Sequence, residues 1–201
     1  MMEPSKDICL SESTATHVIV ILTIKRRMHL ALATKQSLLD VGVQEEQIHI
    51  IEGYDKEDYK GMLRPHLLLS NAFMEFILPY AVENNTSIFY TECGTLFNCN
   101  PFDISIGEDR INWLGYIRNM KWYIIGTKLI YLPLTIIKDM VTNPPPMAHL
   151  DRMIRNYGRK NDCLVVADET HISQMNYASD WGTVEQLKRK ENLKNKIKKS
   201  V

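Results

Sequence analysis

The chain has 201 residues, 45% apolar and 24% charged, which is long enough for one domain with a full core and is typical of a soluble globular protein. Basic and acidic residues number 24 each, so the overall charge predicts no particular partner. The distribution is uneven, because residues 188–199 hold seven basic residues and one acid, which leaves 17 basic against 23 acidic residues elsewhere.

The N-terminus and the cysteines predict a cytoplasmic protein. Residues 1–15 are polar and lack the apolar core of a signal peptide, so we expect a flexible leader before a domain that spans residues 16–201. No apolar run reaches the length of a membrane span. The four cysteines show no CxxC pair and no regular spacing, which favours reduced thiols over a disulfide or metal framework: Cys9, Cys93, Cys99 and Cys163.

Residues 17–51 have the pattern of a strand–helix–strand unit. Residues 17–24 are continuously apolar and rich in β-branched side chains, like a strand buried on both faces. Apolar residues then recur at helical spacing from Met28 to Leu39, and Gly42 ends this helix. A second strand is predicted over 47–51. Such a strand–helix–strand crossover implies a parallel, right-handed arrangement of the two strands.

A second helix and a third strand continue this alternation. After the polar loop 54–64, residues from Leu68 to Tyr80 form one broad apolar face, and Pro79 should bend the last turn. A third strand is predicted over 88–90. The order β-α-β-α-β is typical of an open α/β sheet flanked by helices.

The second half of the chain is less regular. Residues 113–116 and 122–125 indicate two short strands, which we expect to form an antiparallel pair, and Pro133 divides the apolar stretch 129–141 into a strand and a helix. Residues 143–146 predict an extended loop. The remaining predicted elements are a helix over 149–157, a last strand over 163–167, and a polar, basic helix over 183–200.

Polar clusters follow each of the three predicted parallel strands, at 23–27, 52–55 and 91–94. In an open α/β sheet, ligands bind outside the carboxyl ends of the strands. The clusters combine cations suited to phosphate, small polar groups suited to a sugar or base, and one acid, which favours a nucleotide-like ligand. Solvated surface loops are the alternative. No GxGxxG or GxxxxGK[ST] motif is present, so the dinucleotide and P-loop fingerprints are missing.

Six segments then occur in a suggestive order: Val18–Arg27, Arg64–Phe73, Ile88–Gly94, Gly126–Tyr131, His149–Asp151 and Ile172–Trp181. In this order the chain resembles the GT-A glycosyltransferases, in particular small viral and bacterial members related to lipopolysaccharide glycosyltransferases. The resemblance covers most of residues 17–182. It implies a single-domain GT-A-like α/β fold with an open mixed sheet, and a UDP- or GDP-linked sugar as donor.

The chain departs from this family at one point. Family members end the strand that resembles 88–94 with paired acids, because Mn²⁺ or Mg²⁺ must bridge the protein to two phosphates. Here Glu92 is followed by Cys93 and Gly94. Three alternatives are open: Glu92 holds a metal with an acid from elsewhere, Lys25, Arg26 or Arg27 neutralises the leaving phosphate without metal, or the fold is kept and catalysis is lost.

The resemblance also implies roles for individual residues. Glu92 is expected at the donor site, Asp151 as the base that deprotonates an acceptor hydroxyl, and Asp180 as a carboxylate that holds a substrate hydroxyl. His149 and Trp181 are expected on the acceptor side, with the indole stacked on a sugar. The expected donor-binding residues are Thr23, Lys25, Arg27, Glu52, Asp55, Gly126 and Thr127.

Each of these residues also has a purely structural interpretation. Glu92 can be a plain loop carboxylate, and Asp151 a residue favoured at a helix N-terminus by the dipole. Ser179-Asp180 can cap the following helix while Trp181 packs in the core. Glu52 and Asp55 can belong to a turn in which Gly53 supplies an unusual backbone angle.

The sequence therefore predicts a hexosyl- or pentosyltransferase that acts on a glycan, a protein or a modified nucleic acid, in the host cytoplasm if it is viral. A catalytically silent sugar-nucleotide-binding scaffold is one alternative, prompted by Cys93 and Gly94. A nucleic-acid-binding module is another, prompted by the basic tail.

Overall fold

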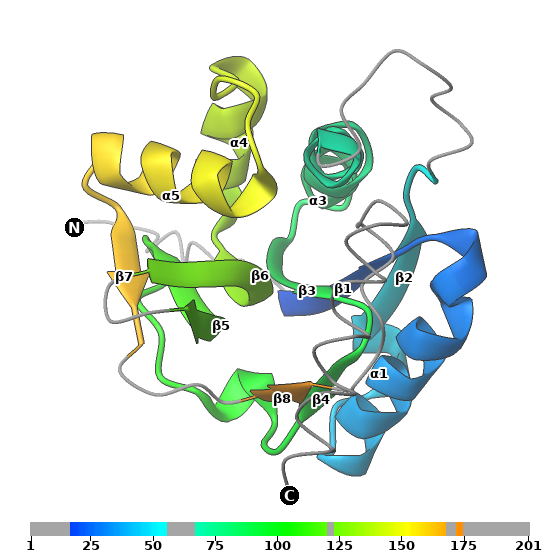
Figure 1. The fold of residues 1–201 in the computed structure, drawn as a ribbon. Coiled ribbons are helices and arrows are strands. Elements are labelled where there is room, and N and C mark those ends of the chain that lie inside the picture. The colour runs from blue at the N-terminus through cyan, green and yellow to red at the C-terminus, as the bar shows by residue number, and fades with distance from the viewer. Residues whose placement is uncertain (1–16, 56–66, 120–122, 168–171, 175–201) are drawn as a thin grey trace, which may run out of the picture.

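A six-stranded mixed sheet with the strand order β2-β1-β3-β6-β5-β7 forms the centre of the fold (Figure 1). The structure is a computed structural model and describes residues 17–55, 67–119, 123–167 and 172–174. Strands β1 (His17–Thr23), β2 (Ile48–Glu52) and β3 (Ser87–Glu92) are parallel to one another. β6 (Tyr123–Leu132) is antiparallel to β3 and to β5 (Ile111–Asn119), and β7 (Leu164–Val166) is parallel to β5.

The strand–helix–strand unit predicted at the start of the chain is confirmed. The middle of β1 is inaccessible to solvent at Ile19, Val20 and Ile21, as its continuous apolar run indicates. The chain then passes through η1 (Lys25–Arg27) into α1 (Met28–Asp40), and Gly42 has the positive φ of +90° that suits a glycine after a helix. The short η2 (Glu45–Gln47) leads into β2.

The second helix is continuous but contains a π-turn. α2 (Leu68–Ala72) passes into the π-helical η4 (Phe73–Ile77) and then into α3 (Leu78–Glu83). The backbone N–H of Leu78 donates to the carbonyl of Phe73, five residues back. The distortion therefore lies before Pro79 and not in the last turn, because proline lacks an N–H and its ring displaces the carbonyl four residues earlier.

The antiparallel pair in the second half is confirmed, but β5 and β6 are longer than the predicted strands. Gly115 allows the two strands to approach, since a Cβ there would lie 2.8 Å from the Cβ of Leu129. Pro133 then ends β6 and precedes α4 (Leu134–Thr142), which agrees with the predicted division of the apolar stretch.

The end of the described chain differs from the prediction. α5 (Leu150–Lys160) follows the extended loop as expected, but β7 is not the last strand. A further strand, β8 (Ile172–Gln174), pairs with β4 (Thr95–Phe97), which is followed by η5 (Pro101–Asp103). β4 and β8 were not predicted, because each has three residues that mix polar and apolar types, whereas the equally short β7 lies in a continuous apolar run. The leader 1–15 and the helix 183–200 lie outside the described residues.

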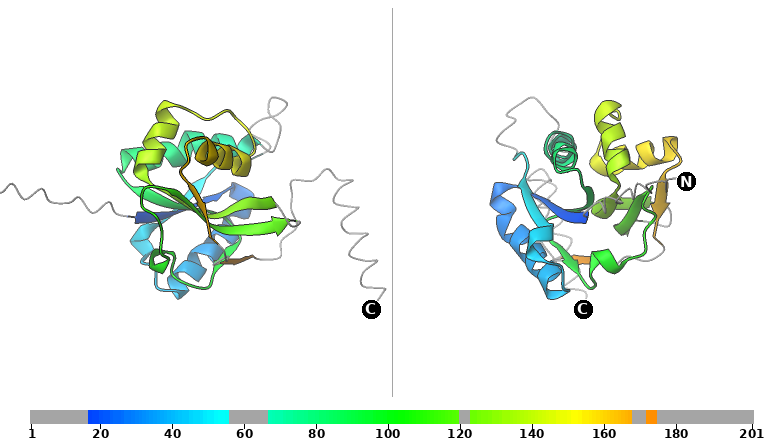
Figure 2. Two further views of the ribbon diagram at one scale, coloured as in Figure 1. Left: turned by 90° about the vertical axis from the view of Figure 1, so that its left-hand side faces the viewer. Right: turned by 180° about the vertical axis from the view of Figure 1, so that it is seen from behind.

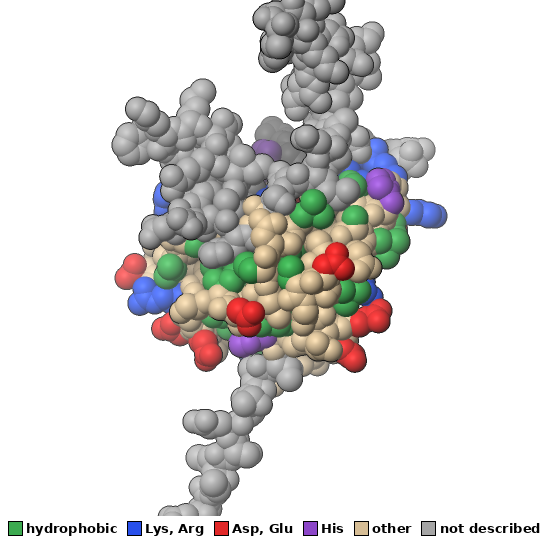
Figure 3. Space-filling view, turned by 90° about the horizontal axis from the view of Figure 1, so that it is seen from below, with side chains coloured by type: hydrophobic (Ala, Val, Ile, Leu, Met, Phe, Trp, Pro, Cys, Tyr) green, Lys and Arg blue, Asp and Glu red, His purple; other side chains and the backbone are tan. Residues whose placement is uncertain are grey.

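The sheet lies between two layers, as Figure 2 shows. Helices α2–α3, α4 and α5 pack on one face, around Tyr90 and Trp113, and α1 with β4 and β8 packs on the other, around Phe89 and Tyr131. On the face seen from below in Figure 1, acidic and apolar side chains are interspersed, and the visible acids do not gather in one patch (Figure 3). None of the described helices combines the length and apolar character needed to cross a bilayer.

Candidate functional site

The carboxyl ends of β1, β2 and β3 meet at one edge of the sheet and are tied to one another beyond the strands. The N–H of Gly53 donates to the carbonyl of Thr23 at 2.7 Å, and the N–H of Cys93 donates to the carbonyl of Leu22 at 3.1 Å. The loops after β2 and β3 therefore lie on either side of the end of β1. This arrangement confirms the predicted meeting of the three polar clusters.

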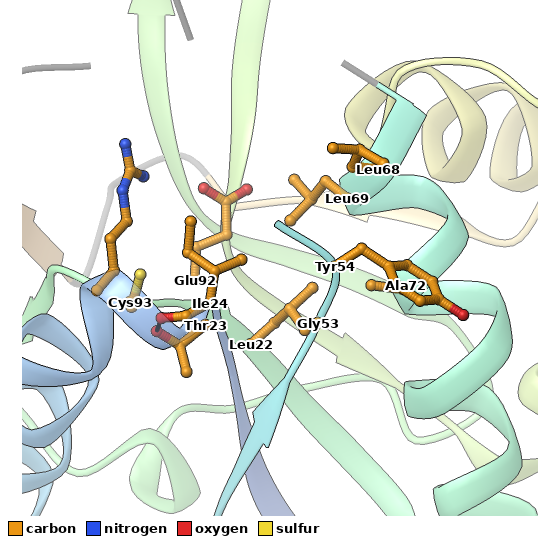
Figure 4. A pocket seen from close by; sticks show the side chains of 11 residues that line it. Leu22, Thr23, Ile24, Gly53, Tyr54, Leu68, Leu69, Ala72, Glu92 and Cys93 are labelled. Carbon is orange, nitrogen blue, oxygen red and sulfur yellow. Dashed lines mark hydrogen bonds between the residues drawn. The ribbon is translucent and has the colours of Figure 1, made fainter. Parts of the chain in front are cut away.

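A pocket of about 460 Å³, including the open space at its mouth, lies at this edge. Figure 4 shows Glu92 at the end of β3, between the β1-side residues Thr23 and Ile24 and the α2 residues Leu68 and Leu69. The lining is mainly apolar with a few polar groups, which is typical of ligand sites. The lining residues are Leu22, Thr23, Ile24, Arg27, Gly53, Tyr54, Leu68, Leu69, Ala72, Glu92 and Cys93.

Glu92 is held by two neighbours on β6. Lys128 Nζ donates to Glu92 Oε2 at 2.5 Å, and Thr127 Oγ1 donates to Glu92 Oε1. The side chains are 19% exposed for Glu92 and 10% for Lys128. Burial by itself raises the pKa of the Glu92 carboxyl, but the Lys128 ammonium and the Thr127 hydroxyl outweigh burial and lower this pKa below its ordinary value. Glu92 is therefore ionised at neutral pH.

The backbone around Glu92 is fixed from both sides. Thr91 Oγ1 donates to the carbonyl of Lys128 at 2.6 Å, and Thr95 Oγ1 donates to the carbonyl of Glu92 at 2.8 Å. Gly94, with a φ of +86°, turns the chain, and its N–H donates to Thr34 Oγ1 on α1 at 2.9 Å. These contacts hold the carboxylate in one place at the wall of the pocket.

The three cations that follow β1 differ in burial and in the contacts that they make. Arg27 is buried, with 8% of its surface exposed, and lines the pocket. Lys25 is exposed and does not line it. Arg26 forms an ion pair with Asp55, with 3.2 Å between Nε and Oδ2. Of the three cations predicted to contact phosphate, only Arg27 lines this pocket. Asp55, predicted as a donor-binding residue, instead pairs with Arg26.

The loop after β2 contributes Gly53 and Tyr54, and not Glu52, which is exposed at the strand end. Gly53 does not have a positive φ, so the predicted unusual backbone angle is wrong. Glycine is needed there for space, because a Cβ would lie 2.8 Å from the Cβ of Ala72 on α2. Tyr54 donates a hydrogen bond to Glu75, which fixes the phenol at the side of the pocket.

Of the residues predicted for the acceptor side, His149 and Asp151 do not line this pocket. His149 precedes α5, and Asp151 lies in its first turn, where Asp151 Oδ1 accepts from the N–H of Arg152 at 2.8 Å. Ser70 Oγ on α2 donates to the carbonyl of Ala148 at 2.6 Å, so the start of α5 adjoins the helix whose other side chains form the pocket wall. Gly126 lies in β6, and Asp180 and Trp181 lie outside the described residues.

The described residues do not fit a divalent metal of the kind that the resemblance implies. They hold no group of three or more His, Cys, Asp or Glu side chains placed to bind an ion. Both oxygens of Glu92 accept hydrogen bonds from β6. Burial raises the pKa of the Cys93 thiol, which keeps it protonated and a poor ligand.

Lys128, Tyr54 and the three α2 residues were not among the residues predicted for the site. A signal for Lys128 was nevertheless present, because a lysine inside an apolar strand requires a partner of opposite charge. The β3–β6 register pairs Tyr90 with Ile130, and carried on by two residues it sets Lys128 opposite Glu92. That pairing joins segments 36 residues apart and is visible only once the strands are known to be neighbours.

The strand order, the layers and the pocket at the strand ends define a single-domain fold of the GT-A glycosyltransferase type. No protein-family model and no curated protein sequence matches the chain. Among the solved structures, 29 chains match. One is a glycosyltransferase involved in the glycosylation of the major capsid of PBCV-1, with a TM-score of 0.55 and 15% identity over 87% of this chain and 98% of that chain. At this identity the likeness shows the fold alone.

Proposed function

We propose that the chain is a glycosyltransferase that moves a sugar from a UDP- or GDP-linked donor to an acceptor hydroxyl. The observation that carries this proposal is the pocket at the carboxyl edge of β1, β2 and β3, where a buried arginine and a fixed carboxylate face an apolar wall. The glycosyltransferase-like fold supports it. An α/β sheet binds nucleotides at this edge.

The donor side follows from the chemistry of the lining. Arg27 suits a phosphate, because a guanidinium forms paired, charge-assisted hydrogen bonds with phosphate oxygens. Thr23 and Tyr54 lie on the β1 and β2 sides, where a base and ribose would be held. The ionised carboxylate of Glu92 would accept hydrogen bonds from the hydroxyls of the donor sugar.

The acceptor side is assigned to the start of α5. Asp151 would take the proton of the acceptor hydroxyl, whose oxygen then bonds to the anomeric carbon as the bond from that carbon to the diphosphate breaks. The nucleoside diphosphate leaves with the electron pair of that bond. His149 would contact the acceptor, and Asp180 and Trp181, from outside the described residues, remain predicted for the same role.

The first experiment is a thermal-shift panel of UDP-, GDP- and CDP-sugars on the full chain. A donor at about one hundred times its dissociation constant stabilises the folded protein by about 2.7 kcal/mol. Arg27→Ala should remove the shift. The matched control Lys138→Ala removes the same amount of charge from an exposed position on α4 and should leave the shift unchanged.

Enzyme assays then separate binding from catalysis. Release of the nucleoside diphosphate from the donor that binds would support the proposal. Binding without any release, with or without candidate acceptors, would favour the catalytically silent scaffold. No shift with any of the sugar nucleotides would contradict the donor site itself.

A further inference from the structure

The Glu92–Lys128 pair occupies the place where the resemblance implies a metal. Glu92 ends β3, and Lys128 lies on the neighbouring antiparallel strand β6 with its ammonium 2.5 Å from the carboxylate. The Lys128 side chain is 10% exposed, so solvent screens its charge only weakly. A positive charge is thus built into the strand next to the single acid of the pocket.

This pair makes the position unfavourable for a divalent cation. A metal ion coordinates carboxylate oxygens at about 2 Å, which would bring it within about 5 Å of the Lys128 ammonium. Like charges at that separation, in a mostly buried setting, repel each other. Among the described residues that line the pocket, no carboxylate other than Glu92 is present to offset this repulsion.

Because Lys128 offsets the charge of Glu92, the positive charge of Arg27 leaves the site favourable for an anion. Arg27 and Glu92 line the pocket, and Lys128 adds a second positive charge behind Glu92. These three side chains together carry a net charge of +1. The charges of Arg26 and Asp55, in the loops after β1 and β2, offset each other in an ion pair. A diphosphate entering the pocket therefore meets positive charge from the protein alone.

We infer that Lys128 supplies, as a fixed protein charge, the positive charge that a divalent cation supplies in the enzymes that the chain resembles, so that nucleoside diphosphates bind this site without metal. The inference rests on the proposed function and concerns the same site. It names the charge that holds the diphosphate, and it makes Lys128 and Glu92 act on diphosphate affinity in opposite directions.

The first test measures the metal dependence of diphosphate binding. UDP and GDP are titrated into the full chain by calorimetry, once with EDTA and once with MnCl₂. We expect the dissociation constant of the diphosphate that binds to differ by less than about threefold between the two conditions. A weakening of tenfold or more in EDTA would overturn the inference and leave the proposed function intact. Absence of binding in both conditions would contradict the proposed function as well.

The second test uses the two partners of the pair, at about pH 8. Glu92→Gln removes a negative charge near the diphosphate and should tighten binding in EDTA by about tenfold. Lys128→Met leaves that negative charge without its partner and should weaken binding by a similar factor. UDP and GDP carry no sugar, so the proposed contact of Glu92 with the donor sugar does not enter the comparison.

The signs of the two changes distinguish a fixed charge from a structural role. If the pair only maintained the shape of the pocket, Lys128→Met would weaken binding and Glu92→Gln would weaken it or leave it unchanged, and either result for Glu92→Gln would overturn the inference. Glu92→Gln keeps the side-chain shape and one of the two acceptor oxygens, so it tests the inference even if Lys128→Met fails to fold. A gain of affinity in Glu92→Gln that Mn²⁺ does not change is the expected result.

Discussion

The carboxylate at the end of β3 and the carboxylate at the start of α5 lie in contrasting surroundings. Glu92 is mostly buried, and both of its oxygens accept hydrogen bonds from side chains of the next strand. Asp151 lies in the first turn of a helix, at a more open position, and accepts a hydrogen bond from the N–H of its own neighbour Arg152.

The difference in surroundings suits the two carboxylates to different roles. A carboxylate that is paired with an ammonium holds its charge over a wide pH range and is unsuited to accept a proton during a reaction. Asp151 has no such ammonium partner among the described ion pairs. The comparison therefore supports the proposal that Glu92 contributes charge and shape, while Asp151 takes the proton of the acceptor.

The largest expected effect is on catalysis. Asp151→Asn should lower the rate of sugar transfer on the order of 10³-fold, because the amide cannot accept the acceptor proton. Diphosphate affinity should stay unchanged, since Asp151 does not line the pocket. Transfer kinetics and calorimetry on the same preparation check both points. An unchanged rate would mean that another residue is the base and that Asp151 and Glu92 do not differ in the proposed way.

The next effect is on stability. Lys128→Ala should lower the free energy of unfolding by about 3 kcal/mol, because it leaves a mostly buried carboxylate without its cation. Chemical denaturation measures this loss, with the exposed Lys138→Ala as control at less than about 0.5 kcal/mol. The double variant Glu92→Gln with Lys128→Ala should recover most of the loss. If it recovers none, the two side chains are not coupled.

A smaller effect is expected at the pocket wall. Gly53→Ala would place a Cβ 2.8 Å from the Cβ of Ala72 and 3.1 Å from Leu22, which should cost about 2 kcal/mol and push α2 away from the sheet. Gly107→Ala is the matched control, since its new Cβ would meet no atom closer than 3.7 Å. The free energy of unfolding and the donor affinity should both change in Gly53→Ala, and neither should change in Gly107→Ala. Equal stability of the Gly53→Ala and Gly107→Ala variants would show that α2 moves to accommodate the new Cβ without loss of stability.

The smallest effect concerns pH. The pKa of Glu92 is lowered in the folded protein, so its stabilising contribution is complete above the unfolded value near 4.5 and is lost as the pH falls through the folded pKa. The difference in unfolding free energy between wild type and Glu92→Gln should therefore shrink as the pH is lowered from about 7 to about 3. Urea titrations at several pH values measure this difference. A constant difference would mean that the carboxylate gains nothing from its partners.

The first half of the fold could be predicted because its signals are local. The continuous apolar run of β1, the helical spacing of α1 and the positive-φ glycine after it each depend on a few adjacent residues. The strands β4 and β8 could not, because each has three residues without a continuous apolar run and is fixed by pairing with a distant segment. The distortion of this helix was predicted in its last turn but lies before Pro79, because a proline indicates a distortion without indicating on which side of it the helix is distorted.

The site divides in the same way. Glu92 was predicted because it ends an apolar strand, and Thr23 and Arg27 because they follow another. Burial separates Arg27 from Lys25, and that depends on how η1 turns against the sheet. Lys128 was missed because its partner is fixed by the antiparallel pairing of β3 with β6, which are separated in the chain by β4, η5 and β5. Local pattern thus locates the edge, and tertiary pairing decides which charges meet there.

The π-turn between α2 and α3 has a consequence for the pocket. One turn of the helix holds an additional residue, so the side chains before it are offset by about 100° relative to an uninterrupted α-helix. Leu68, Leu69 and Ala72 precede this turn and line the pocket, while Leu78 and Ala81 follow it and pack in the core. Deleting one residue from 73–77 would restore a regular helix and rotate the pocket wall out of position. The widened turn thus sets the rotation between the half of the helix that lines the pocket and the half that packs in the core.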